Sequence, residues 1–224
     1  MDKKLRNKLI IFGILSCVGI FIIIYTGYEN KNKLKKVQES QQEIIKEKQE
    51  ENAKIEAENK HIEELESKNQ TALSKFYEGK YIEAIEQSDE IIALDPENYK
   101  AYNTKGIAIS YKGDFEGGIE NIDKSLEIKP DFGYARFNKA LAYELFGKYD
   151  ESLKWYDKAL EVEDYVWSYY GKASIYGRYG DLENTLKYMK KAIEIDPKVK
   201  DAAREESDFN NVRKYKEFNE LISN

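Results

Sequence analysis

The side chains that most often carry out chemistry are few and scattered in this sequence. The single histidine, His61, lies in a highly charged stretch, and the single cysteine, Cys17, lies in an apolar run. There is no Ser/His/Asp or Cys/His set, no phosphate-binding glycine loop and no metal-ligand spacing. Acidic pairs such as Glu63–Glu64 and Glu205–Glu206 are typical of solvated helix faces. The sequence therefore predicts a protein that is not an enzyme and uses neither a cofactor nor a metal.

The charge balance also argues against a nucleic-acid partner. The chain has 224 residues, with 36 Lys and Arg against 42 Asp and Glu, for a formal net charge of -6. The two signs are mixed along most of the chain, whereas nucleic-acid binding requires a one-sided basic stripe. The length suits one domain plus appendages. The abundance of Lys, Asn, Ile and Tyr is typical of an AT-rich bacterial genome.

An apolar run near the N-terminus is long enough to cross a membrane. Residues 9–28 carry no charge and would span about 30 Å as a helix, after a short tail of residues 1–8. Two alternatives remain. A cleaved signal sequence fits less well because the run is long and its exit, "YTGY", is a poor cleavage site. A lipoprotein with Cys17 at its processing site fits less well because Leu15 is large and eleven uncharged residues follow.

The charges that flank this span favour neither orientation clearly. Four basic residues flank each side, so the positive-inside rule gives almost a tie. A short tail before a single span favours an N-terminus in the cytoplasm. We therefore expect a single-pass cell-membrane protein whose large domain lies on the extracytoplasmic side.

The next segment, residues 29–64, is predicted to be a polar helical tether. Residues 29–70 contain neither Pro nor Gly and are rich in good helix formers. A heptad frame starting at Leu34 places apolar residues at six of eleven a and d positions, which is a weak coiled-coil pattern. The segment is thus either a solvated spacer or a coil through which the chain forms a homo-oligomer. The six positions are Leu34, Val37, Ile44, Ile55, Ile62 and Leu65.

Beyond the tether, one sequence pattern recurs four times. Gly79, Gly113 and Gly147 are 34 residues apart, and Gly180 follows after 33. An aromatic residue or leucine stands two places after each glycine, and an amphipathic stretch then runs to a proline, which Asp164 replaces in the third unit. The glycine is suited to end one helix and the proline to stop the next. A period near 34 predicts stacked helical hairpins, with one inter-repeat loop a residue shorter.

Small residues recur in register where two helices of a hairpin would approach closely. They lie in the middle of each first helix, early in each second helix and, except for Ile91, later in the second helix. Aliphatic pairs near the end of each second helix are expected to fill the seam to the next hairpin. The small residues are Ala72, Gly106, Ala140 and Ala173, then Ala84, Gly118, Ser152 and Thr185, then Ser125, Ala159 and Ala192; the pairs are Ile92/Leu94, Leu126/Ile128, Leu160/Val162 and Ile193/Ile195.

This recurring pattern of glycines, prolines and small residues resembles that of the tetratricopeptide repeat family. The resemblance implies an all-α solenoid with four units over residues 65–197, the first of them the weakest, followed by capping helices over residues 198–224. An open array ends in an apolar face that a polar-backed segment must cover. The apolar side of that cap is expected to consist of Val199, Ala203, Phe209, Val212, Phe218 and Leu221.

The same resemblance places a partner-binding groove on the concave face formed by the first helices. Tyr134, Phe137 and Tyr170 are expected to be its exposed anchors. The alternative is that the aromatic residues do not mark a binding groove, because a chain with 18 tyrosines will have some at groove positions by chance, and some could pack between hairpins. A clamp for a terminal carboxylate is not predicted, since Asn103 and Ile107 occupy its Lys-then-Asn positions. The groove residues carried over are Phe76, Tyr77, Asn103, Ile107, Tyr111, Tyr134, Phe137, Asn138, Leu141, Glu144, Trp167, Tyr170, Ser174 and Arg178.

Two functions follow from these expectations. One is a membrane-anchored scaffold that binds a protein or peptide partner in the groove, with chaperoning of emerging polypeptides as a promiscuous variant. The other is a self-assembling structural element of the cell envelope that oligomerises through residues 29–64. The oligomeric state of the chain distinguishes them.

Overall fold

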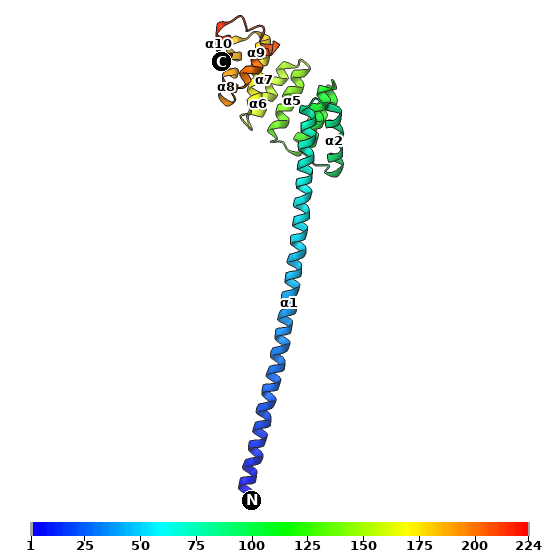
Figure 1. Cartoon of the computed structure of the whole chain (residues 1–224), viewed down its shortest axis with the longest axis vertical. Helices are drawn as coiled ribbons and strands as arrows, with labels where there is room; N and C mark the ends of the chain where they lie inside the picture. The colour runs from blue at the N-terminus through cyan, green and yellow to red at the C-terminus, as the bar shows by residue number, and fades with distance from the viewer. Residues whose placement is uncertain (1, 224) are drawn as a thin grey trace. The chain divides into compact units, whose positions relative to one another are not determined.

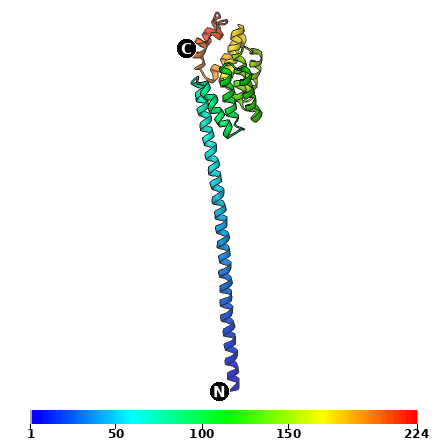
Figure 2. The same ribbon diagram turned by 90° about the vertical axis from the view of Figure 1, so that its right-hand side faces the viewer.

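A single helix, α1 (Lys3–Tyr77), opens the computed structural model, which describes residues 2–223 (Figure 1). Its length agrees with the absence of Pro and Gly over residues 29–70. Figure 2 shows from a second direction that the helix continues without a break. Internal contacts divide the chain between Glu63 and Glu64, so the last turns of α1 belong to the domain that follows.

The described residues before Glu64 are all exposed except Gly19, which is half-buried. The five predicted heptad residues that lie in it, from Leu34 to Ile62, are all exposed. Surface ion pairs such as Lys35–Glu39, at 3.7 Å, contribute little to stability. The apolar side chains of residues 9–28 contact nothing else in the described part of the chain, and by length and composition this helix could cross a membrane.

The domain from Glu64 onward consists of helical hairpins, and no strand occurs among residues 2–223. The end of α1 packs against α2, and each later unit contributes one hairpin, so the predicted all-α solenoid of four repeats is confirmed (Figure 1). The remaining hairpin helices are α2 (Tyr81–Leu94), α3 (Tyr99–Tyr111), α4 (Phe115–Ile128), α5 (Gly133–Leu145), α6 (Tyr149–Leu160), α7 (Val166–Tyr179) and α8 (Leu182–Ile195).

The turn inside each hairpin depends on a glycine in the left-handed region. The repeated glycines have φ values from 71° at Gly147 to 94° at Gly113, a conformation that other residues resist. Two of the following helices are then capped by an aspartate. Asp114 accepts a hydrogen bond from Gly117 N at 2.9 Å and Asp181 one from Asn184 N at 3.0 Å.

The third unit is one residue shorter than the other units, and the shortening lies in a helix rather than in a loop. Helix α6 has 12 residues, whereas α2, α4 and α8 have 14. The connection to α7 covers residues 161–165 and is longer than the connections at residues 95–98 and 129–132. The expectation of a shorter loop was wrong, because α6 ends at Leu160 and the chain continues as a turn at residues 161–162.

The small residues lie where the helices of each hairpin meet, as predicted. All of them are buried, and so is Ile91. The closest approach joins α3 and α4, where a Cβ added to Gly106 would lie 2.7 Å from the carbonyl oxygen of Gly118. In the next hairpin the Ser152 hydroxyl donates to the Ala140 carbonyl at 2.8 Å. Larger side chains at these places would force the helices apart.

The expectation for the aliphatic pairs was only half right. The first member of each pair is half-buried at the junction, as is Ile128. Leu94, Val162 and Ile195 are exposed instead. These three residues lie at or beyond the C-terminal end of their helices, where the chain is already turning toward the next unit.

A repeated lysine–aspartate contact joins successive units. In three consecutive junctions a lysine of the first helix reaches back to an aspartate of the preceding second helix. These Lys–Asp bridges are Lys105–Asp89 at 2.6 Å, Lys139–Asp123 and Lys172–Asp157. The ammonium groups of Lys139 and Lys172 also lie 4.1 Å from the ring centres of Trp155 and Tyr188, respectively, so each buried lysine is neutralised and covered.

The C-terminal segment closes the array. It comprises α9 (Val199–Glu205), a 3-10 turn η1 (Ser207–Phe209) and α10 (Lys216–Ile222). Phe209 and Phe218 stack at 5.2 Å within an apolar core that also includes Met189 of α8. All six residues predicted to form the apolar side of the cap belong to this core or pack against it.

Candidate functional site

A hollow with a volume of about 380 Å³ lies on the face formed by the first helices of the units. We call it the aromatic hollow, because most of its lining is aromatic. Helices α1, α3, α5 and α7 supply most of that lining, and α6, α9 and the chain just after α9 complete it. The lining residues are Phe76, Tyr77, Tyr111, Tyr134, Phe137, Asn138, Leu141, Glu144, Tyr156, Tyr165, Trp167, Tyr170, Gly171, Ser174, Ala202 and Glu206.

The hollow gathers most of the predicted groove residues but not all of them. Ile107 is fully buried in the core between helices. Asn103 is also buried and accepts a hydrogen bond from Asn138 Nδ2 at 3.1 Å, so it supports the lining without being part of it. Arg178 pairs with Asp208 at 2.5 Å and does not line the hollow.

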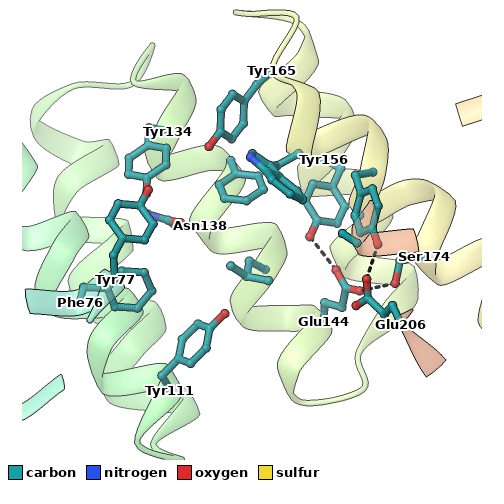
Figure 3. Close-up of a pocket in the computed structure, with 16 residues that line it drawn as sticks. Phe76, Tyr77, Tyr111, Tyr134, Asn138, Glu144, Tyr156, Tyr165, Ser174 and Glu206 are labelled. Carbon is teal, nitrogen blue, oxygen red and sulfur yellow. Dashed lines mark hydrogen bonds between the residues drawn. The ribbon is translucent and has the colours of Figure 1, made fainter. Parts of the chain in front are cut away.

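One wall consists of rings from α1, α3 and α5. Phe76 meets Tyr111 edge to face at 5.2 Å and lies 5.5 Å from the Tyr77 ring. The hydroxyls of Tyr77 and Tyr134 lie 2.6 Å apart and form a hydrogen bond (Figure 3). Burial raises the pKa of the Tyr134 phenol far above its usual value, so this group stays protonated.

A second group of rings comes from α5 and the start of α7. Tyr165, directly before α7, packs edge to face on Phe137 at 4.9 Å. Burial raises the pKa of Tyr165 to about 12. In Figure 3 the hydroxyls of Tyr111 and Tyr165 point into the space from opposite ends. Tyr165 was not predicted, because it lies in a connection, where the repeat pattern gives no register.

The opposite side of the hollow is acidic. Glu144 of α5 accepts hydrogen bonds from the Tyr156 hydroxyl at 2.6 Å and the Ser174 hydroxyl at 3.1 Å (Figure 3). Burial raises the pKa of Glu144 to about 7, although these two donors and Arg178 act in the other direction. Glu144 is therefore poised to change charge near neutral pH.

Glu206 is the second carboxylate on this side. It accepts a hydrogen bond from the Tyr170 hydroxyl, and burial raises its pKa above the usual value (Figure 3). The prediction that Glu205 and Glu206 form a solvated pair is correct for Glu205, which is exposed, and wrong for Glu206. The cap folds back against α7 and carries Glu206 into the hollow.

Of the three anchors expected to be exposed, Tyr134 and Phe137 are half-buried and Tyr170 is buried. Tyr170 is only 6% exposed and packs against Phe209 of the cap at 5.8 Å. Phe76 is 8% exposed and belongs to the core, whereas Tyr77 and Trp167 are 65% and 39% exposed. The expectation that Tyr170 is an exposed anchor was therefore wrong, since the cap covers one of its faces.

Two further lining residues depend on each other. Tyr156 comes from α6, a second helix, and is fully buried apart from its contact with the hollow. A Cβ at Gly171 would lie 2.3 Å from the Tyr156 ring, so only glycine lets Tyr156 pass to Glu144. In the sequence, the glycine at position 171, in the middle of a predicted helix, was the feature that could have indicated this contact.

Comparisons with known proteins identify two of the repeats by sequence and the solenoid fold by structure. A family model described as "Tetratricopeptide repeat" matches residues 134–164 and 168–199, the third and fourth units. A thermophilic TPR protein from Thermus thermophilus, TTC0263, is similar in structure, with 22% identity, 60% of this chain and 75% of that chain covered, and a TM-score of 0.55. The crystal structure of MamA gives 21% identity, coverage of 60% and 79%, and a TM-score of 0.50. No curated protein sequence matches the chain.

These similarities agree with the geometry. The matched segments begin with α5 and α7, and the hairpins before them repeat the same glycine turns and small-residue contacts. The chain therefore contains tetratricopeptide repeats, and its hairpin domain has the fold of a tetratricopeptide repeat solenoid.

Proposed function

We propose that this protein is a membrane-anchored interaction scaffold that binds a peptide or protein partner in the aromatic hollow. The observation that carries the proposal is the hollow itself, in which side chains from four successive units converge on a volume of about 380 Å³. Ligand sites typically measure about 300–1,000 Å³ and combine apolar walls with a few polar groups. Tyrosine and tryptophan are the residues that most often supply binding energy at protein interfaces.

Residues 9–28 support the membrane anchor. Their apolar side chains are exposed, so this segment is not a core helix of the described chain and needs an apolar environment from elsewhere. A signal sequence would share these properties. In the proposed arrangement residues 1–8 lie in the cytoplasm, residues 29–64 form the tether, and the repeats with their cap lie on the extracytoplasmic side.

The binding proposal is tested by partner capture from solubilised membranes. Tyr111→Ala and Trp167→Ala each remove an exposed ring of the hollow, and Leu94→Ala removes an exposed apolar side chain outside it. We expect the two hollow variants to lose partners that the wild type and Leu94→Ala both retain. Circular dichroism checks that each variant is folded. Equal recovery of the same partners by all four proteins would contradict the proposal.

A second function is favoured by a separate observation, the exposed apolar stripe on α1. Leu34, Val37, Ile44, Ile55 and Ile62 have no partner among the described residues, and a second copy of the helix would cover them. The protein would then be a self-assembling structural element. Sedimentation of the detergent-solubilised full chain decides between the two, because a monomer supports the scaffold and a stable dimer or trimer supports assembly through residues 29–64.

A further inference from the structure

We infer that the aromatic hollow receives a positively charged side chain, lysine or arginine, of the bound peptide. This inference rests on the proposed function and specifies the chemistry of the partner at the same site. It depends on two independent features of the lining, which are its two carboxylates without a lysine or arginine among the lining residues and its aromatic faces.

The charge of the lining is one-sided. Glu144 and Glu206 are its acidic residues, and no lysine or arginine is among the lining residues. The nearest arginines are engaged elsewhere. Arg178 pairs with the buried Asp208, and Arg213 donates to the backbone carbonyls of Ala203 and Glu206. A cation from a partner would therefore meet two carboxylates and no lysine or arginine within the lining, while Arg178, outside the lining, already favours the charged forms of both carboxylates.

The carboxylates are held in place but keep capacity for another donor. Tyr156 and Ser174 bind the two oxygens of Glu144, and each oxygen of a carboxylate has room for a second hydrogen bond. Among the hydrogen bonds of residues 2–223, the side-chain carboxylate of Glu206 accepts only through Oε2. Because burial disfavours both charges, a bound ammonium or guanidinium would recover part of the lost solvation energy.

The rings provide a second kind of contact for the same cation. Aromatic faces attract ammonium and guanidinium groups, and the attraction grows when the site excludes water. Phe137, Trp167 and the tyrosines line the same hollow as the two carboxylates. The inward hydroxyls of Tyr111 and Tyr165 add neutral acceptors. The methylene stem of a lysine or arginine would at the same time fill the apolar part of the hollow.

The two obvious competitors fit less well. An acidic side chain or terminal carboxylate would face two like charges and no cation. For a metal ion, no group of three or more His, Cys, Asp and Glu side chains within residues 2–223 is arranged to hold one. An organic cation on a flexible stem matches both the aromatic walls and the acidic side.

The test uses the full chain in detergent as bait for a library of random peptides. We expect selected peptides to share a lysine or arginine at one position. Replacing that residue by acetyl-lysine or norleucine should weaken binding at least about tenfold, the usual effect of removing one member of a desolvated charge pair. The double variant Glu144→Gln/Glu206→Gln should show a similar loss, whereas Glu205→Gln, an exposed neighbour, should bind like the wild type.

The outcomes separate this inference from the proposed function. Peptides that bind the wild type, are lost in Trp167→Ala and contain no shared basic residue would overturn the cation inference and leave the binding function intact. Basic peptides that bind the double glutamine variant unchanged would also overturn it. If no selected peptide depends on Trp167, both fail. Because the acetyl-lysine peptides are tested on the wild type, the result does not depend on the variant folding.

Discussion

The phenol hydroxyls of Tyr77 and Tyr134 lie 2.6 Å apart, although 57 residues separate them in the chain. They connect the last turn of α1 with α5, so the contact skips the second unit and links the first repeat to the third. Tyr77 is exposed, whereas Tyr134 is partly buried. The bond therefore helps to set the width of the aromatic hollow at this end.

Removing either hydroxyl should have unequal effects on stability. Tyr77→Phe leaves the partly buried Tyr134 hydroxyl without this partner, while Tyr134→Phe leaves the Tyr77 hydroxyl free to bind water. We expect both to lower the free energy of unfolding, within about 0.5–1.5 kcal/mol, with Tyr77→Phe the more costly. Denaturant titration of both variants and the double variant measures this. Additive losses in the double variant would show that the hydroxyls do not interact.

The raised pKa of Glu144 predicts a pH dependence of stability. Its pKa is about 7 in the folded protein against a usual value of 4.5. Between these values the folded protein keeps a proton that the unfolded chain has released, so the free energy of unfolding falls as the pH rises. The total change from this group is on the order of 3 kcal/mol.

Glu144→Gln should remove this part of the pH dependence. Compared with the wild type, the variant should become relatively more stable at about pH 8 than at about pH 5, whatever constant cost its lost hydrogen bond adds. Denaturant titrations at the two pH values measure the difference, with Glu205→Gln as the exposed control. A variant whose stability changes with pH as the wild type's does would show that Glu144 titrates at its ordinary pKa.

Ala159 tests the packing between helices. It is buried, 2% exposed, where α6 meets its neighbours. Ala159→Leu should overpack this contact and cost about 1–3 kcal/mol. Lys48→Ala, on the exposed part of α1, should cost less than about 0.5 kcal/mol. Equal thermal midpoints for the wild type and Ala159→Leu would contradict the repeat register.

Gly171 tests how the acidic side of the hollow is built. A methyl group at this position meets the Tyr156 ring at 2.3 Å, so Gly171→Ala must displace the ring or α7. We expect a cost of about 1–3 kcal/mol and a loss of the Tyr156–Glu144 hydrogen bond, visible as a changed pKa of Glu144 in NMR titration. Gly133→Ala is a milder control, since its added Cβ has 3.4 Å to the nearest atom. An unchanged Glu144 pKa in folded Gly171→Ala would refute the coupling.

The proposed anchor predicts how the protein fractionates. Full-length chain should stay in membranes after an alkaline wash, whereas a variant lacking residues 1–28 should not. The mature N-terminus should precede residue 9. An N-terminus at Cys17 would indicate a lipoprotein, and one near Tyr28 a cleaved signal sequence.

The positions predicted best are those that repeat. Ala72, Gly106, Ala140 and Ala173 could be placed from the sequence because the same steric demand recurs at each hairpin, and the structure buries all of them. A periodic pattern reports only what every unit shares. The concave-face residues of α3, α5 and α7 followed from the same register, although Asn103 and Ile107 proved to be buried.

The features that the sequence did not predict lie at positions that do not recur from one repeat to the next. Tyr165 and Glu206 lie in connections, where neither helix periodicity nor register applies. Tyr170 was expected to be exposed because the position of the cap against α7 is set by long-range packing around Phe209 and Phe218. The two-residue shortening of α6 was also missed, because the sequence shows that the third unit is one residue shorter without indicating whether the helix or the loop loses residues.

The recurring Lys–Asp bridges make the units interchangeable at their junctions. A duplicate of residues 113–146 inserted after Phe146 would carry both members of its own Lys139–Asp123 bridge and would leave the Lys172–Asp157 bridge of the following junction intact. The array could thus be lengthened by gene duplication without any new junction having to evolve. The same insertion would leave Tyr77 beside the original Tyr134 and Ser174 beside the copy of Glu144, so the two ends of the aromatic hollow would lie one unit further apart, and recognition is tied to the number of units in a way that folding is not.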